Sequence, residues 1–162
     1  MLQRLFIIIF ILTGYFISDS LMAQNVPVVK FSEFEKKLQS KSDTVYIINF
    51  WATWCAPCRK ELPEFEKAHQ TFSGDKVRVL LVSLDFPSQA KNLPGFLTEN
   101  SITAPVLLLN DPDANAWIDK VDPAWSGALP ATLIYKKNNR LFYEKQLTFD
   151  DIRNSIQSLN QF

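Results

Sequence analysis

The 162-residue sequence has too few residues of certain types to support several classes of protein. It contains two cysteines and a single histidine, His69, so these residue types cannot complete a four-ligand zinc or copper site. Two cysteines are also too few for a small domain held together by scattered disulfides. No basic stretch is present, and lysine plus arginine equals aspartate plus glutamate at 17 each, which excludes the charge pattern of a nucleic-acid-binding protein. We therefore expect no metal, no cofactor and no nucleic-acid partner.

The first residues have the pattern of an export signal. A single positive charge precedes an apolar run that begins at Leu5 and weakens toward Ile17, and Ala23 offers a small residue for cleavage. The run is shorter than the about 20 apolar residues that span a bilayer. We predict a cleaved signal peptide over residues 1–23, with a retained N-terminal membrane anchor as the alternative. Residues 24–162 suit one domain, expected in the periplasm or anchored to the membrane and facing it.

Hydrophobic patterning in the rest of the sequence predicts alternating helices and strands. Continuous apolar runs rich in β-branched residues are typical of strands buried on both faces of a sheet, whereas apolar stripes and capping residues indicate helices. The predicted elements are helices over 32–38, 55–72, 89–100, 111–120 and from 148 onward, and strands over 45–51, 77–84, 106–109, 132–135 and 141–143.

Polar residues and topology rules complete the predicted architecture. Ser32 with Glu35 has the pattern of a capping box, Asp111 precedes a proline that suits the first turn of a helix, and Thr148 suits the N-cap of the last helix. Two buried strands joined by a helix require a right-handed parallel crossover, and the terminal hairpin makes the sheet mixed. The prediction is an α/β domain of three layers, with helices on both faces of a mixed central sheet.

Both cysteines lie in the motif Trp54-Cys55-Ala56-Pro57-Cys58, between a predicted strand and a predicted helix. The N-terminus of a helix carries partial positive charge and free N–H groups, which favour a thiolate there. Pro57 fits the first helical turn, and Cys58 lies close enough to Cys55 for a disulfide. We expect Cys55 to attack a substrate disulfide and Cys58 to resolve the resulting mixed disulfide.

Other interpretations of the cysteine pair carry less weight. A stabilising disulfide across so short a loop would remove little entropy from the unfolded chain. A metal-binding chaperone would hold a soft ion through Cys55 and Cys58. A thiol peroxidase or peroxide sensor depends on one reactive thiol that reaches the sulfenic acid, and a resolving cysteine three residues away suits disulfide exchange better. Arg59, not histidine, follows Cys58, so the pattern for covalent haem attachment is absent.

The segment from Phe50 to Pro63 resembles the active-site stretch of the thioredoxin superfamily. Its residues on either side of the cysteines resemble the exported TlpA/ResA-like branch, and Leu129-Pro130 falls where that family places a cis-proline. The resemblance extends from about Val26 to the C-terminus. It implies a thioredoxin fold and a thiol–disulfide oxidoreductase that acts on protein thiols and disulfides.

The resemblance also implies roles for individual residues. Pro130 would be cis beside the two sulfurs, Leu129 would touch the disulfide, and both would border the substrate together with Trp54 and Pro57.

Proton handling would differ from that in cytoplasmic thioredoxin. Asn49 stands where thioredoxins bury an aspartate, and Glu61 stands where the TlpA/ResA-like branch has a glutamate. Glu61 would accept the proton of Cys58 or disfavour its thiolate by like-charge repulsion; the alternative is a solvated glutamate in the first helical turn.

The sequence says less about the direction of electron transfer and about the partners of the protein. The resemblance favours a reductant of exported protein disulfides, which include apocytochrome cysteines in cytochrome c maturation, and this implies re-reduction by a membrane-embedded electron donor. Membrane contact of the chain itself depends on retention of the N-terminal segment. Trp125 lies in an unusually long aromatic connection before Pro130, where it either lines the substrate groove or packs beneath the loop; packing is the expected role.

Overall fold

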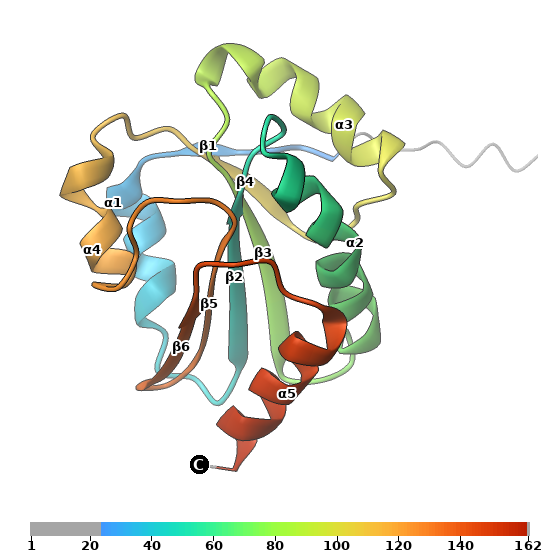
Figure 1. The fold of residues 1–162 in the computed structure, drawn as a ribbon, viewed down its shortest axis with the longest axis vertical. Helices are drawn as coiled ribbons and strands as arrows, with labels where there is room; N and C mark the ends of the chain where they lie inside the picture. The colour runs from blue at the N-terminus through green and yellow to red at the C-terminus, as the bar shows by residue number, and fades with distance from the viewer. Residues whose placement is uncertain (1–23, 162) are drawn as a thin grey trace, which may run out of the picture.

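The structure is a computed structural model that describes residues 24–161 (Figure 1). The predicted signal peptide over residues 1–23 lies outside the described residues. Within the described part of the chain, no helix has the length and apolar character needed to cross a membrane.

A mixed sheet of six strands forms the centre of the domain, in the order β1-β4-β3-β2-β5-β6. Strand β2 is parallel to β3 and antiparallel to β5, so Ile48 lies between Leu80 on one side and Leu133 on the other. This central position explains the nearly unbroken apolar sequence of β2. The strands are β1 (Val28–Val29), β2 (Val45–Trp51), β3 (Val77–Ser83), β4 (Val106–Leu109), β5 (Ala131–Lys136) and β6 (Asn139–Tyr143).

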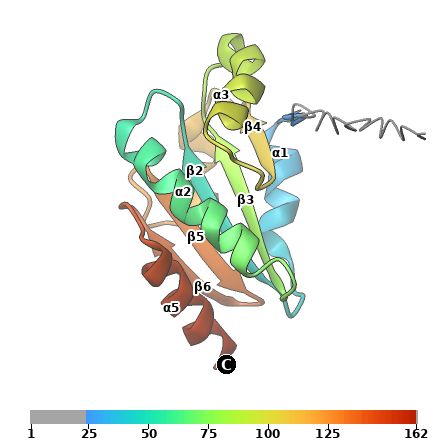
Figure 2. The ribbon, with the colours of Figure 1, turned by 90° about the vertical axis from the view of Figure 1, so that its right-hand side faces the viewer.

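Helices cover both faces of the sheet, as Figures 1 and 2 show. One apolar cluster joins the sheet to α2 (Ala56–Thr71), α3 (Leu93–Glu99) and α5 (Phe149–Asn160). The cluster on the opposite face joins it to α1 (Phe31–Phe34), η1 (Glu35–Gln39) and α4 (Ile118–Val121). Two short 3₁₀ helices, η2 (Pro87–Asn92) and η3 (Ala114–Ala116), lie in the connections after β3 and β4. The predicted three-layer α/β architecture is therefore confirmed.

Two predicted helix starts, at Ser32 and at Asp111, are wrong. Helix α1 begins after Lys30 without a side-chain cap, so Ser32 is not an N-cap. Asp111 opens no helix of its own; its carboxylate accepts a hydrogen bond from the backbone N–H of Phe31 at 3.2 Å. The residue expected to cap the helix over 111–120 therefore satisfies the first N–H group of α1, which is 80 residues earlier in the chain.

Several other elements also differ from the prediction. Strand β1, for which no element was predicted, is a short parallel partner of β4. The predicted helix over 89–100 divides into η2 and α3, and the predicted helix over 111–120 is reduced to η3 and α4. The capping box of α5 is present and confirms Thr148 as its N-cap, with Asp151 as the reciprocal partner. Helix α2 continues through Pro63.

Candidate active site

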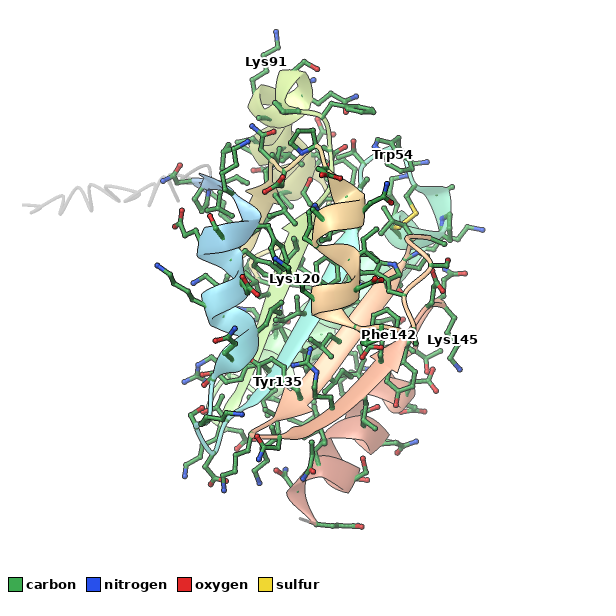
Figure 3. All side chains as sticks on the ribbon, turned by 90° about the vertical axis from the view of Figure 1, so that its left-hand side faces the viewer. Trp54, Lys91, Lys120, Tyr135, Phe142 and Lys145 are labelled. Atoms are coloured by element: carbon green, nitrogen blue, oxygen red, sulfur yellow. A yellow bond between two sulfur atoms is a disulfide. The ribbon has the colours of Figure 1, made fainter. Side chains whose placement is uncertain are left out.

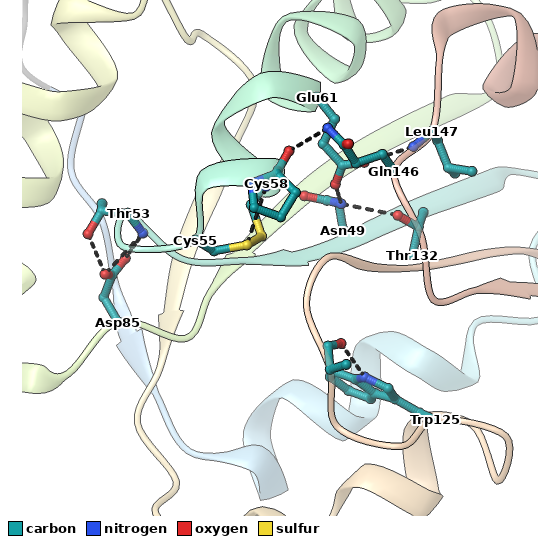
Figure 4. Close-up of a disulfide and its surroundings, with 12 residues drawn as sticks. Asn49, Thr53, Cys55, Cys58, Glu61, Asp85, Trp125, Thr132, Gln146 and Leu147 are labelled. Atoms are coloured by element: carbon teal, nitrogen blue, oxygen red, sulfur yellow. Dashed lines mark hydrogen bonds between the residues drawn. A yellow bond between two sulfur atoms is a disulfide. The ribbon is translucent and has the colours of Figure 1, made fainter.

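The two cysteines form a disulfide at the N-terminus of α2. Cys55 is the N-cap of this helix, and its sulfur accepts a hydrogen bond from the backbone N–H of Cys58 at 3.3 Å. Cys55 is 6% exposed and Cys58 is fully buried, so Cys55 is the sulfur that a partner can approach (Figure 4). The local sequence produces this arrangement because Pro57 occupies the first helical turn, where a missing N–H group costs little.

The loop that carries Cys55 is fixed to the end of β3 by a buried carboxylate, Asp85. The backbone N–H of Thr53 donates to both carboxylate oxygens at 3.1 Å, and its hydroxyl donates to one of them at 2.6 Å. Ser83 donates a further hydrogen bond from its hydroxyl at 2.7 Å. Asp85 was not among the residues predicted from sequence. The available signal was its place directly after a buried parallel strand, at the edge of the sheet where the cysteines also lie.

Three of the four predicted substrate-binding residues, Trp54, Pro57 and Leu129, line an open groove beside the disulfide. The Leu129–Pro130 peptide bond is cis, which confirms the geometry implied by the resemblance. Pro130 itself is buried, whereas Leu129 borders the groove. The groove has a volume of about 530 Å³ and is lined by Trp54, Cys55, Ala56, Pro57, Leu84, Gly127, Ala128 and Leu129. Figure 3 shows Trp54 at the surface next to the sulfur atoms, and its side chain is 57% exposed.

A second carboxylate, that of Glu144, holds the wall of this groove that leads into Pro130. It accepts hydrogen bonds from the hydroxyl and backbone N–H of Ser126 and, at 2.9 Å, from the backbone N–H of Ala128. The hydrogen bond from the Ser126 hydroxyl is the main cause of a lowered pKa of Glu144. Nothing in the sequence pointed to Glu144, because its partners lie in a different loop.

Glu61 lies behind the disulfide and is 2% exposed, so the alternative of a solvated glutamate is wrong. Its carboxylate accepts a hydrogen bond from Asn49 Nδ2 at 2.7 Å and another from the backbone N–H of Leu147 at 2.9 Å (Figure 4). Burial raises the pKa of Glu61 to about 7, and the two hydrogen bonds oppose this shift. A carboxyl group with this pKa exchanges its proton near neutral pH.

Asn49 connects Glu61 to the sheet. Its amide nitrogen also donates to Thr132 Oγ1 at 3.1 Å, in the neighbouring strand β5. Asn49, whose amide does not titrate, therefore orients the carboxylate of Glu61.

Trp125 packs beneath the loop, as expected, and does not line the groove. It is 3% exposed, its ring centroid lies 4.6 Å from that of Phe50, and it contacts Trp117 edge to face. Its indole N–H donates to the carbonyl of Ala128 at 2.9 Å, so it supports the groove wall from below (Figure 4).

The described residues contain no group of three or more His, Cys, Asp or Glu side chains that could hold a metal ion. The site brings together the disulfide, the buried carboxyl group of Glu61 and an open groove bordered mainly by apolar residues.

Comparisons with known proteins agree with this geometry. The model of the AhpC/TSA family matches residues 21–143. Sporulation thiol-disulfide oxidoreductase A of Bacillus subtilis is 35% identical over 63 residues, which cover 38% of each chain. Thiol-disulfide oxidoreductase ResA of Geobacillus thermodenitrificans is 27% identical over 115 residues, which cover 69% of this chain and 61% of the relative. The alignments thus span less than two thirds of the length of either relative.

A solved structure supports the fold. The thioredoxin-related protein from Neisseria meningitidis serogroup B superposes with a TM-score of 0.65 at 23% identity, over 77% of this chain and 91% of the other. Together with the sequence matches, this confirms the thioredoxin fold and the resemblance to ResA-like proteins.

Proposed function

Because the chain belongs to the AhpC/TSA family and has a thioredoxin fold, we propose that it is a thiol–disulfide oxidoreductase that acts on protein disulfides through Cys55 and Cys58. One observation carries the proposal: the disulfide lies at the N-terminus of α2 with its less buried sulfur facing the groove bordered by Leu129.

The reaction begins with the reduced dithiol. The Cys55 thiolate attacks one sulfur of a substrate disulfide, the substrate S–S bond breaks, and the departing thiolate takes up a proton. The Cys58 thiol then loses its proton, and its sulfur attacks that of Cys55. The mixed disulfide breaks and the second substrate sulfur leaves as a thiolate that is protonated. Two electrons have passed to the substrate, and the protein retains the disulfide seen in the structure.

Glu61 is the proposed acceptor of the Cys58 proton. The two residues are three positions apart in α2 and therefore lie on the same side of the helix. With a pKa of about 7, the carboxyl group is partly ionised at neutral pH, which is the condition for efficient proton transfer to and from a thiol.

We propose that the domain works outside the cytoplasm as a reductant. Export is supported by the signal-like residues 1–23, and the direction is the one that the resemblance of the cysteine segment to the TlpA/ResA-like branch favours. Its substrates would be exported protein disulfides, with the cysteines of apocytochromes as one class. A reductant in an oxidising compartment must be recharged, so a membrane-embedded electron donor is part of the proposal.

Trapping the mixed disulfide tests the mechanism. Reduced Cys58→Ser protein should couple to an oxidised peptide and gain the mass of one peptide thiol, and dithiothreitol should release it. Cys55→Ser should neither trap the peptide nor catalyse insulin reduction by dithiothreitol. Catalysis that persists in Cys55→Ser would refute the mechanism. Tight copper binding or rapid peroxide consumption by the reduced wild type, without disulfide reduction, would favour the alternatives.

The reduction potential of the Cys55–Cys58 couple tests the direction separately. Equilibration with glutathione buffers should give a value toward the thioredoxin end of the known range, about −270 mV. A value near about −120 mV, typical of a strong oxidant, would contradict the assignment as a reductant.

A further inference from the structure

Two exposed aromatic side chains lie at the edge of the sheet that carries the disulfide. Trp54 follows β2 and is 57% exposed, and Phe86 follows the neighbouring strand β3 and is 65% exposed. A contiguous apolar surface marks a site that binds other molecules, whereas single exposed apolar residues are common. The groove beside the disulfide accounts for Trp54, but Phe86 does not border it.

Phe86 borders a second groove, which adjoins the first at Leu84. Leu84 lines both, so the apolar surface continues from the disulfide past the end of β3. The second groove has a volume of about 340 Å³ and runs toward the connection after β4. Its apolar lining residues include Leu84, Phe86, Pro87, Leu109, Pro112 and Trp117.

The charges along the two grooves restrict what they can bind. No lysine or arginine lines either groove. Two carboxylates line the second one, and both have protein partners: Asp85 accepts from Thr53 and Ser83, and Asp111 accepts from the N–H of Phe31. The surface therefore favours an apolar or basic segment and disfavours an acidic one.

We propose that the second groove binds a further stretch of the substrate polypeptide, in an extended conformation, while a cysteine of that polypeptide is joined to Cys55. This inference rests on the proposed function, because it extends the same site. The preferred substrates would be unfolded chains with an apolar side chain a few residues from the reactive cysteine. Small disulfides occupy only the groove beside the disulfide and make no use of Phe86.

A peptide series tests the proposal. Each peptide carries one disulfide and a single leucine, placed from two to eight residues before or after the cysteine, in an otherwise Gly/Ser sequence. The wild type should reduce peptides with leucine in one part of this range about tenfold faster, in kcat/KM, than peptides without leucine. Phe86→Ser should abolish this preference and leave the reduction of bis(2-hydroxyethyl) disulfide unchanged. Val28→Ser is the matched control, because Val28 is 52% exposed and lines neither groove.

Cross-linking locates the bound segment independently of rates. A photoreactive phenylalanine at the preferred leucine position, in the mixed disulfide trapped by Cys58→Ser, should label residues 84–87 or 109–117. Labelling only elsewhere, or equal rates across the peptide series in wild type and Phe86→Ser, would overturn the second groove. Failure to reduce even bis(2-hydroxyethyl) disulfide would instead contradict the proposed function itself.

Discussion

At the scale of single residues, the fold strongly raises the pKa of the Glu61 carboxyl group. Water would stabilise its carboxylate, but the protein offers only the amide of Asn49 and the N–H of Leu147. These two donors do not compensate for burial, so the pKa rises from 4.5 to about 7.

This shift predicts how stability depends on pH. Between pH 4.5 and 7 the folded chain holds a proton at Glu61 that the unfolded chain has lost, so the free energy of unfolding should fall as pH rises and level off above pH 7. The full effect is on the order of 3 kcal/mol. Urea titrations of oxidised wild type and Glu61→Gln at pH 5 and pH 8 measure it.

The glutamine variant should lose most of this pH dependence and gain stability relative to wild type at pH 8. Its resolving step should also slow, seen as a mixed disulfide that persists at neutral pH. If the titrations of both thiols and the resolving rate equal those of wild type, Glu61 does not handle the proton.

The two tryptophans beside the site predict opposite outcomes on truncation. Trp125→Ala should destabilise the protein by about 3–5 kcal/mol, because it leaves a cavity against Phe50 and Trp117. Trp54→Ala removes an exposed ring and should change stability little, but it should weaken the reduction of peptide disulfides. Thermal unfolding together with peptide kinetics separates these effects. A stable, inactive Trp125→Ala would contradict the packing role.

At the scale of elements, α1 and α5 show that a capping pattern needs the right tertiary surroundings. Ser32-x-x-Glu35 and Thr148-x-x-Asp151 look alike in sequence, but only Thr148 caps a helix. Thr148→Ala should lower the free energy of unfolding by about 1 kcal/mol, whereas Ser32→Ala should leave it nearly unchanged. Denaturant unfolding of both variants measures these two changes. Equal losses in the free energy of unfolding would contradict the conclusion that only Thr148 caps a helix.

The carboxylate of Glu144 holds the loop before Pro130 by accepting hydrogen bonds from its N–H and O–H groups, as a capping side chain does at the start of a helix. Glu144→Ala removes the acceptor of Ser126 and Ala128, so the groove wall should become less ordered. KM for peptide disulfides should rise several-fold with little change in Tm. Glu99→Ala, an exposed carboxylate at the end of α3, serves as the control. An unchanged KM in Glu144→Ala would show that the loop keeps its shape without this residue.

At the scale of the whole molecule, the mixed sheet gathers the site from distant parts of the chain. The loops after β2 and β3 and the loop before β5 meet at one edge, because parallel strands end there and β5 starts there in the opposite direction. Asp85 and Glu144 then fix two of these loops. The placement of Cys55 opposite Leu129 is therefore a property of the whole sheet.

The N-terminal segment is tested on the full chain. Expression in a bacterium with a periplasm should yield a periplasmic protein whose first residue is Gln24, measured by N-terminal sequencing of the fractionated protein. A full-mass product that sediments with membranes would instead identify a retained anchor. Recovery of the full-mass protein in the cytoplasm would contradict export.

The sequence by itself determined the elements with strong local signals. The apolar runs of β2 to β5, the start of α2 directly after Cys55 and the capping of α5 by Thr148 depend on neighbouring residues, and the structure confirms them. The cysteine motif could likewise be predicted from neighbouring residues, whereas the cis bond before Pro130 was implied only by the resemblance to the thioredoxin superfamily.

Only the tertiary structure decided how the remaining polar residues are used. Asp111 caps α1, Asp85 and Glu144 fix loops around the groove, and Asn49 orients Glu61, in each case across long separations in sequence. Local patterns cannot predict such contacts, because a carboxylate bonds whichever N–H or O–H groups the fold brings to it. For the same reason the pKa of Glu61 follows from burial, which no residue shows on its own.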